Sequence, residues 1–147
     1  MGYAHQGWIT EDHKYFLMND EHDEMNAVQA GQPMPGTRTL IWDVQDLDDP
    51  IMVKEHFGTT FTIDHNLYIK GNLMYQSNYL SGLRILDISD PENPKEVGFL
   101  DTVPWSEEVE IDGSWSNYPF FASGTIVVSS EKEGIFFLKY RPQQLVP

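Results

Sequence analysis

The sequence contains no cysteine, and this absence removes several chemistries at once. Without thiols the chain has no disulfide, no thiolate nucleophile and no zinc–thiolate site. Basic residues are also scarce: nine Lys and Arg stand against 23 Asp and Glu, for a net charge of −14 at pH 7. Such a surface repels phosphate backbones and anionic lipid headgroups. We therefore expect no nucleic-acid partner, whereas cations and basic partners remain open.

Long apolar runs are missing as well. No segment approaches the roughly 20 apolar residues that a membrane-spanning helix needs, so we expect no membrane insertion. The first residues lack the basic and apolar regions of a signal peptide, and the chain as written carries no export address. No nucleophile elbow, P-loop, dinucleotide fingerprint or HExxH motif is present, so no catalytic residue is predicted.

Short apolar and aromatic runs dominate instead, cut at close intervals by Gly, Pro, Asn and Asp. With little helical periodicity, this pattern predicts an all-β fold. The clearest unit spans residues 65–100, with strands expected at 66–70, 73–77, 83–88 and 96–100. A four-stranded antiparallel meander of this size is one β-propeller blade.

The same order of strands recurs on both sides of this unit, at about 5–57 and 115–140. The sequence therefore predicts about three four-stranded antiparallel blades, a partial β-propeller forming a single unit over residues 1–147. The third unit stops after its third strand, and the first carries an acidic insertion between Asp20 and Gly36. Three blades cannot close a ring, so we expect a homo-oligomer or missing blades in a longer parent chain.

Several short-range features are interpreted as structural. Aspartates that follow the third strands should accept backbone N–H groups and fix the turns into the fourth strands; these are Asp43, Asp46, Asp87 and Asp90. Glycines before the third strands should adopt positive φ; these are Gly36, Gly82 and Gly134.

Two histidines, His5 and His65, occupy the same position in their repeats, where Trp115 stands in the third unit. The inner strand of each blade lines the central channel, so these residues should converge on one ring. With Asp64 beside His65, the pair could hold a divalent transition metal. The alternative, which we weight more, is that each histidine hydrogen-bonds the backbone or an Asp of a neighbouring blade.

Acidic and aromatic residues supply a second set of candidates. The acidic segment contains Asp20, Glu21, Asp23 and Glu24, which suit calcium, although a solvated, dispensable loop is the favoured interpretation. Aromatic side chains form a candidate binding surface, and the residues concerned are Trp105, Trp115 and Tyr118. The favoured alternative is that such aromatics pack between blades or, for Trp105, anchor a loop.

Three stretches of the chain resemble the choice-of-anchor B proteins, which contain LVIVD-type repeats. They are His5 to Asp12 with Tyr15-Phe16, Asp64 to Tyr68 with Gly82-Leu83-Arg84, and Trp115 to Phe121 with Ser123-Gly124. The resemblance implies a β-propeller exported to the cell surface or outside the cell, and it implies that this chain matches the C-terminal part of longer proteins. It implies no particular activity.

The expected function is therefore a non-catalytic interaction module that binds a protein or glycan through its loops and channel mouth. The alternative is a metal-dependent hydrolase or oxidoreductase in which the channel histidines are ligands. A divalent metal is the one candidate cofactor.

Overall fold

The computed structural model describes residues 3–32, 34–106 and 108–142. The described chain forms three antiparallel sheets, which confirms the all-β prediction. The first sheet contains, in this order, β1 (Ala4–Ile9), β2 (Tyr15–Asp20), β3 (Arg38–Asp43) and β4 (Ile51–Phe57). The second contains β5 (Asn66–Lys70), β6 (Leu73–Ser77), β7 (Leu83–Asp87) and β8 (Lys95–Leu100). The third contains β9 (Ser114–Tyr118), β10 (Ile126–Ser130) and β11 (Gly134–Leu138).

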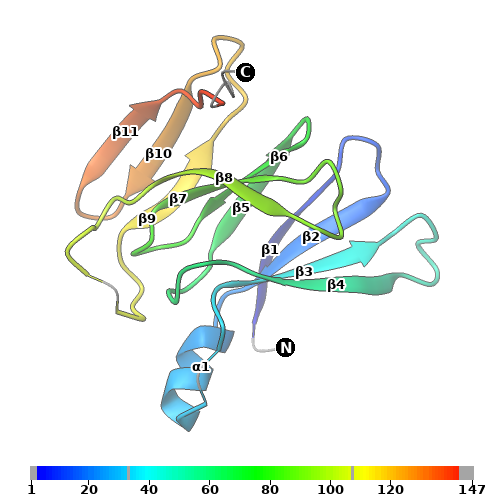
Figure 1. The fold of residues 1–147 in the computed structure, drawn as a ribbon, viewed down its shortest axis with the longest axis horizontal. Helices are drawn as coiled ribbons and strands as arrows, with labels where there is room; N and C mark the ends of the chain where they lie inside the picture. Colours follow the sequence, from blue (N-terminus) through cyan, green and yellow to red (C-terminus); the bar gives the residue numbers. More distant parts are fainter. Residues whose placement is uncertain (1–2, 33, 107, 143–147) are drawn as a thin grey trace, which may run out of the picture.

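The sheets lie side by side like adjacent propeller blades, with the second between the other two (Figure 1). Their first strands are neighbours, since β5 contacts both β1 and β9. Each face of the second sheet has its own core cluster. One joins it to the first sheet through Leu17, Ile41, Leu67, Ile69, Met74, Leu86 and Ile88. The other joins it to the third sheet through Tyr75, Leu83, Ile85, Ile126 and Val128.

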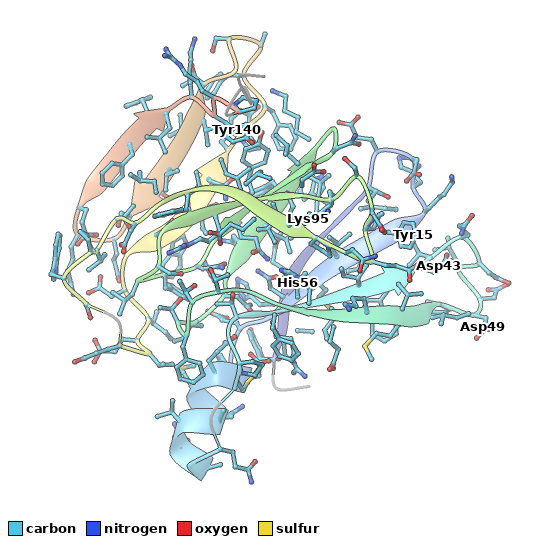
Figure 2. All side chains as sticks on the ribbon, viewed as in Figure 1. Tyr15, Asp43, Asp49, His56, Lys95 and Tyr140 are labelled. Carbon is cyan, nitrogen blue, oxygen red and sulfur yellow. The ribbon has the colours of Figure 1, made fainter. Side chains whose placement is uncertain are left out.

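The turn aspartates behave as predicted. Asp43, Asp46, Asp87 and Asp90 each accept the backbone N–H of the residue two positions on, at 2.8–3.2 Å. These short carboxylates close the turns into β4 and β8. Asp43 lies at an end of the first sheet remote from the helix of the insertion (Figure 2). The four turn aspartates are exposed or half-buried.

The glycine prediction is right at two positions and wrong at one. Gly82 and Gly134 have φ of 76° and 94°. Gly36 is absent from the positive-φ residues, and a different constraint acts there: a Cβ would lie 2.1 Å from the carbonyl oxygen of Gly58. The close approach of two backbone segments, and not the sign of φ, therefore requires glycine at this position.

The acidic insertion differs from its prediction in two ways. It contains a helix, α1 (Asp23–Ala30), which ends where Gly31 adopts φ 65°. More importantly, its acidic end is not a solvated loop: Asp20, Glu21, Asp23 and Glu24 are all at most 8% exposed. The distal part of the helix and the residues directly after it, Gly31 and Gln32, are open to solvent. The segment is therefore packed into the protein at the side chains that were expected to face water.

The outward face of the third sheet is apolar. Ile135 and Phe137 of β11 are 63% and 73% exposed, while Phe136 and Leu138 on the opposite face pack against the second sheet. Tyr140 packs beside Gly98 where these two sheets meet (Figure 2). An exposed apolar face agrees with the expected association of blades, which stays a prediction.

Within the described residues, no helix has the length and apolar character needed to cross a membrane.

Candidate metal centre at the channel mouth

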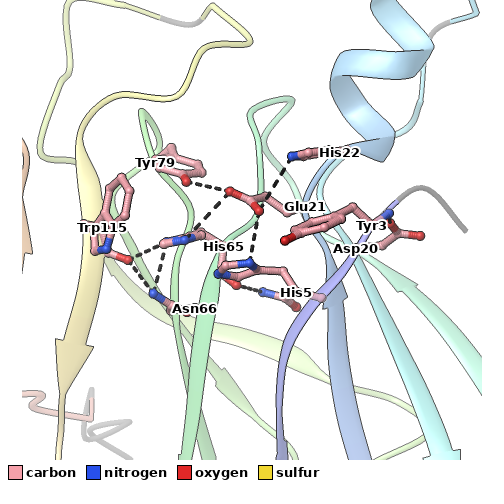
Figure 3. Close-up of polar contacts among 10 residues, drawn as sticks. Tyr3, His5, Asp20, Glu21, His22, His65, Asn66, Tyr79 and Trp115 are labelled. Carbon is pink, nitrogen blue, oxygen red and sulfur yellow. Dashed lines mark hydrogen bonds and ion pairs between the residues drawn. The ribbon is translucent and has the colours of Figure 1, made fainter.

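The first strands of the three sheets, β1, β5 and β9, are the inner strands of the blades. The polar residues of interest gather at one end of these strands, which we call the channel mouth (Figure 3). His5 lies near the start of β1, and His65 directly precedes β5. Glu21 directly follows β2, which runs antiparallel to β1 and so returns the chain to this end. Tyr79 comes from the turn between β6 and β7. The repeat pattern thus brings two blades' loops and strand starts to one point.

The carboxylate of Glu21 faces a ring nitrogen of each of the two imidazoles. Its Oε2 is 3.2 Å from His5 Nδ1, and its Oε1 is 3.8 Å from His65 Nε2. The two imidazole rings stack with centroids 4.5 Å apart. One ligand atom from each of the three residues lies within 4.8 Å of the others. In a tetrahedral zinc site with arms of 2.0–2.1 Å, ligand atoms are about 3.3 Å apart, so these atoms are near the required spacing.

His65 is held in one tautomer by the neighbouring blade. Its Nδ1 lies 2.6 Å from the carbonyl oxygen of Trp115. A carbonyl only accepts, so Nδ1 carries the proton and Nε2 presents its lone pair to Glu21 and His5. Burial lowers the pKa of His65, which favours the neutral ring. This contact matches the predicted bond between a histidine and a neighbouring blade, and it is also the orienting contact typical of a metal-binding histidine.

A buried tyrosine holds Glu21 from the other side. Tyr79 is 1% exposed, and its hydroxyl donates to Glu21 Oε1 at 2.7 Å. Burial and this bond raise the pKa of Tyr79 well above its usual value, so it remains a donor. Its ring also stacks on His65 at 4.6 Å. The carboxylate and one imidazole are therefore both oriented by groups outside the cluster.

His22 also joins the cluster from the insertion, although it is not among the predicted site residues. Its Nε2 lies 3.8 Å from Glu21 Oε2, and Tyr3 stacks on its ring at 4.4 Å. A signal was available: His22 follows Glu21 directly at the end of β2, in the same inter-strand position as Tyr79 in the next blade.

Asp64 does not join the histidines, and its predicted place with them is wrong. It is fully buried and belongs to a second group, in which ligand oxygens of Asp23, Glu24 and Asp64 lie within 4.8 Å of one another. Asp64 precedes His65 where the chain enters β5, and the two side chains enter different clusters. Arg38 serves this second group: its backbone N–H faces both Glu24 Oε1 and Asp64 Oδ2 at 3.2 Å.

The buried carboxylates of this second group strongly disfavour their charged forms. Burial raises the pKa of Glu24 to about 11, and the nearby Asp64 and Asp23 add to the rise. Burial, followed by repulsion from Asp23, raises the pKa of Asp64 well above its usual value. The pKa of Asp23 is also raised by burial, in spite of its ion pair with Arg38. The three carboxyl groups therefore favour their neutral forms unless a cation compensates their charge.

The predicted aromatic surface falls into two places. Trp115 is 45% exposed and sits edge-on to His65 at 4.8 Å, so it borders the histidine–carboxylate cluster. Tyr118 continues β9 into an aromatic row on the inner strands, made with Trp8, Tyr68 and Phe120. Trp105 is 74% exposed on the connection between β8 and β9 and has no ring contact among the described residues.

The fold and the mouth define the class of protein as propeller-like, with an imidazole–carboxylate cluster at the start of its inner strands. A scan against family models found no match, and neither the curated proteins nor the solved structures contain a significant match. The resemblance to choice-of-anchor B proteins, and the exported location that it implies, stay predictions.

Proposed function

We propose that this protein is a β-propeller binding module whose channel mouth holds a divalent transition-metal ion through His5 Nδ1, Glu21 and His65 Nε2. The observation that carries the proposal is the contact of His65 Nδ1 with the Trp115 carbonyl oxygen, which leaves Nε2 to face Glu21. Imidazole and carboxylate together suit zinc, iron or nickel more than calcium or magnesium.

The supporting contacts extend beyond the three ligands. The Trp115 carbonyl orients His65, and the Tyr79 hydroxyl orients Glu21. Such outer contacts accompany metal ligands because they fix ring orientation and raise ligand basicity. His5 is only partly buried, so the centre opens toward solvent on its side. Three protein ligands leave at least one coordination position for water or for a ligand's donor atom.

The recognition surface would be Trp115, which borders the centre, extended by the separate aromatic row that includes Tyr118 and Trp8. Trp115 and Tyr118 are each nearly half exposed on β9, and Trp8 faces the same row from β1. Rings of this kind supply large contact area at little entropic cost. A ligand held by the metal would lie against Trp115 first. The expected protein or glycan ligand stays a prediction.

A metal-dependent hydrolase is the second candidate, and the three-ligand arrangement favours it. Two histidines, one carboxylate and an open position are the donor set of several catalytic zinc sites, where the ion activates water. Among the described residues, the carboxylates of Asp23 and Glu24 belong to a separate buried group with Asp64 and not to the mouth. A binding module requires no additional catalytic group, so we prefer it.

The test is metal affinity. Protein freed of metal by chelation should bind one Zn²⁺ or Co²⁺ per chain in calorimetric titration. Replacing a ligand, as in His65→Ala or Glu21→Gln, should weaken binding by roughly 100-fold or more, since losing even an outer contact costs 10–100-fold. Tyr79→Phe, which removes only the orienting hydroxyl, should therefore weaken it by about tenfold.

His13→Asn is the matched control. His13 is exposed in the turn after β1 and has φ of 60°, which Asn tolerates. This variant should bind metal like the parent. Equal affinity in the parent and in His65→Ala would refute the proposed centre. Hydrolysis of activated esters that depends on added Zn²⁺ and disappears in His65→Ala would promote the enzyme over the binding module.

A further inference from the structure

Three carboxylates from two distant parts of the chain meet inside the protein. Asp23 and Glu24 open helix α1, and Asp64 precedes β5. They are at most 8% exposed, and Glu24 and Asp64 are fully buried. One oxygen of each lies within 4.8 Å of the others. A solvated acidic face does not explain this group, because its side chains are almost entirely removed from solvent.

Arg38 occupies one side of the group and leaves the other side without partners. Its Nε lies 2.6 Å from Asp23 Oδ2, and another guanidinium nitrogen donates to Asp20 at 2.9 Å. Its backbone N–H faces one oxygen each of Glu24 and Asp64. Among the described residues, no donor group faces the second oxygens, Asp23 Oδ1, Glu24 Oε2 and Asp64 Oδ1. The Asp23 and Glu24 carboxyl groups lie within hydrogen-bonding reach of each other, which requires that they share either a proton or a cation.

Buried carboxylate oxygens without partners require either protons or a cation. Unpaired buried charge is among the costliest states that a folded protein can hold. One guanidinium faces four carboxylates, counting Asp20, so a single positive side chain does not balance the group. Oxygens on opposite sides of a calcium ion, with ligands at 2.3–2.6 Å, are about 4.6–5.2 Å apart. The observed spacing fits inside that span.

We propose that Asp23, Glu24 and Asp64 bind one Ca²⁺ ion through their second oxygens. The donor set is all oxygen, which separates this site from the imidazole centre at the mouth. The ion would join the insertion to the entry of β5. Since Asp20 and Asp23 flank the Glu21–His22 pair, it would also fix the segment that carries Glu21. The proposal stands on the buried carboxylates alone and does not depend on the transition-metal centre.

The experiment compares melting temperatures of the full chain with and without Ca²⁺. After chelation, adding Ca²⁺ at about 100-fold above its Kd should raise the melting temperature by roughly 5–10 °C. Metal analysis after dialysis should find one Ca²⁺ per chain, and Zn²⁺ should not displace it. Unchanged melting in Ca²⁺ would overturn the proposal and indicate that the carboxyl groups share protons.

Two variants locate the effect. Glu24→Gln and Asp64→Asn should lose most of the Ca²⁺-dependent rise. In chelator, Glu24→Gln should melt at or above the parent, because an amide can donate to the neighbouring carboxylates and cannot ionise. Glu92→Gln, in the exposed β7–β8 turn, is the matched control and should keep the full rise. If Ca²⁺ stabilises Glu24→Gln and Asp64→Asn as much as the parent, the site is wrong. If either variant fails to fold, the other variant and the parent's own response decide.

Discussion

Arg38→Ala is expected to lower the free energy of unfolding by about 3–5 kcal/mol, because it leaves buried carboxylates without their cation. The Arg38 side chain is 17% exposed and contacts Asp20 and Asp23, which are 0% and 8% exposed. Removing one partner of a buried ion pair costs far more than the pair contributes. Urea denaturation in chelator, followed by tryptophan fluorescence, would measure the change.

The control is an exposed pair. Lys132 contacts Asp112 at the surface, and exposed pairs contribute little, so Lys132→Ala should leave the urea midpoint unchanged. Arg38→Lys should recover only part of the loss, because an ammonium cannot reproduce the planar fork that meets both aspartates. A midpoint for Arg38→Ala equal to that of Lys132→Ala would show that the carboxylates are not charged in the folded protein.

Gly82→Val should cost about 3 kcal/mol or more, for two additive reasons. Gly82 has φ of 76°, where a side chain costs about 1–2 kcal/mol. A Cβ there would also lie 2.1 Å from the carbonyl oxygen of Leu100 and 2.8 Å from the backbone nitrogen of Thr102. Backbone atoms cannot swing aside as side chains do, so the turn into β7 must shift against the end of β8.

Gly71→Val separates the two reasons. Gly71 has φ of 57°, but a Cβ there would meet no atom within 4 Å. It should therefore cost only the conformational part, about 1–2 kcal/mol. Thermal or urea unfolding of both variants gives the comparison. Equal losses at the two positions would mean that the close packing of Gly82 against β8 contributes nothing.

The strands were predictable because their signals are local. In the second blade, the predicted bounds of β5 and β6 match the structure, since Gly71-Asn72 fixes the hairpin between two apolar runs. In the same blade, β7 ends and β8 begins one residue earlier than predicted, at Asp87 and Lys95. Helix α1 is not predicted because its apolar residues show little helical periodicity. Gly31, which caps the helix, is therefore not preceded by the pattern that would mark it as a helix end.

The candidate site was predictable only where the repeat applied. His5 and His65 share a repeat position, and equivalent positions on neighbouring inner strands must be close, so their contact could be anticipated. The sequence predicts Glu21 as a member of an acidic segment and not as a metal ligand shared with the histidines. Its burial depends on Tyr79, 58 residues away, and no local pattern reports such a contact.

The buried carboxylates show a further limit of composition. An acidic run is normally solvated, and the prediction for Asp23 and Glu24 followed that rule. What overturns it is Arg38 at the start of β3 and Asp64 before β5, which enclose the run from other elements. Long-range pairing of this kind is decided by the fold, and therefore appears only once the blades are placed.

Anomalous diffraction from crystals of the full chain grown with Zn²⁺ tests the central proposal most directly. We predict one strong zinc peak at the channel mouth, within about 2.0–2.2 Å of His5 Nδ1, a Glu21 carboxylate oxygen and His65 Nε2. The same peak should be absent from crystals of His65→Ala. A map with no peak at the mouth, or with zinc only at exposed histidines such as His13, would contradict the proposed metal centre.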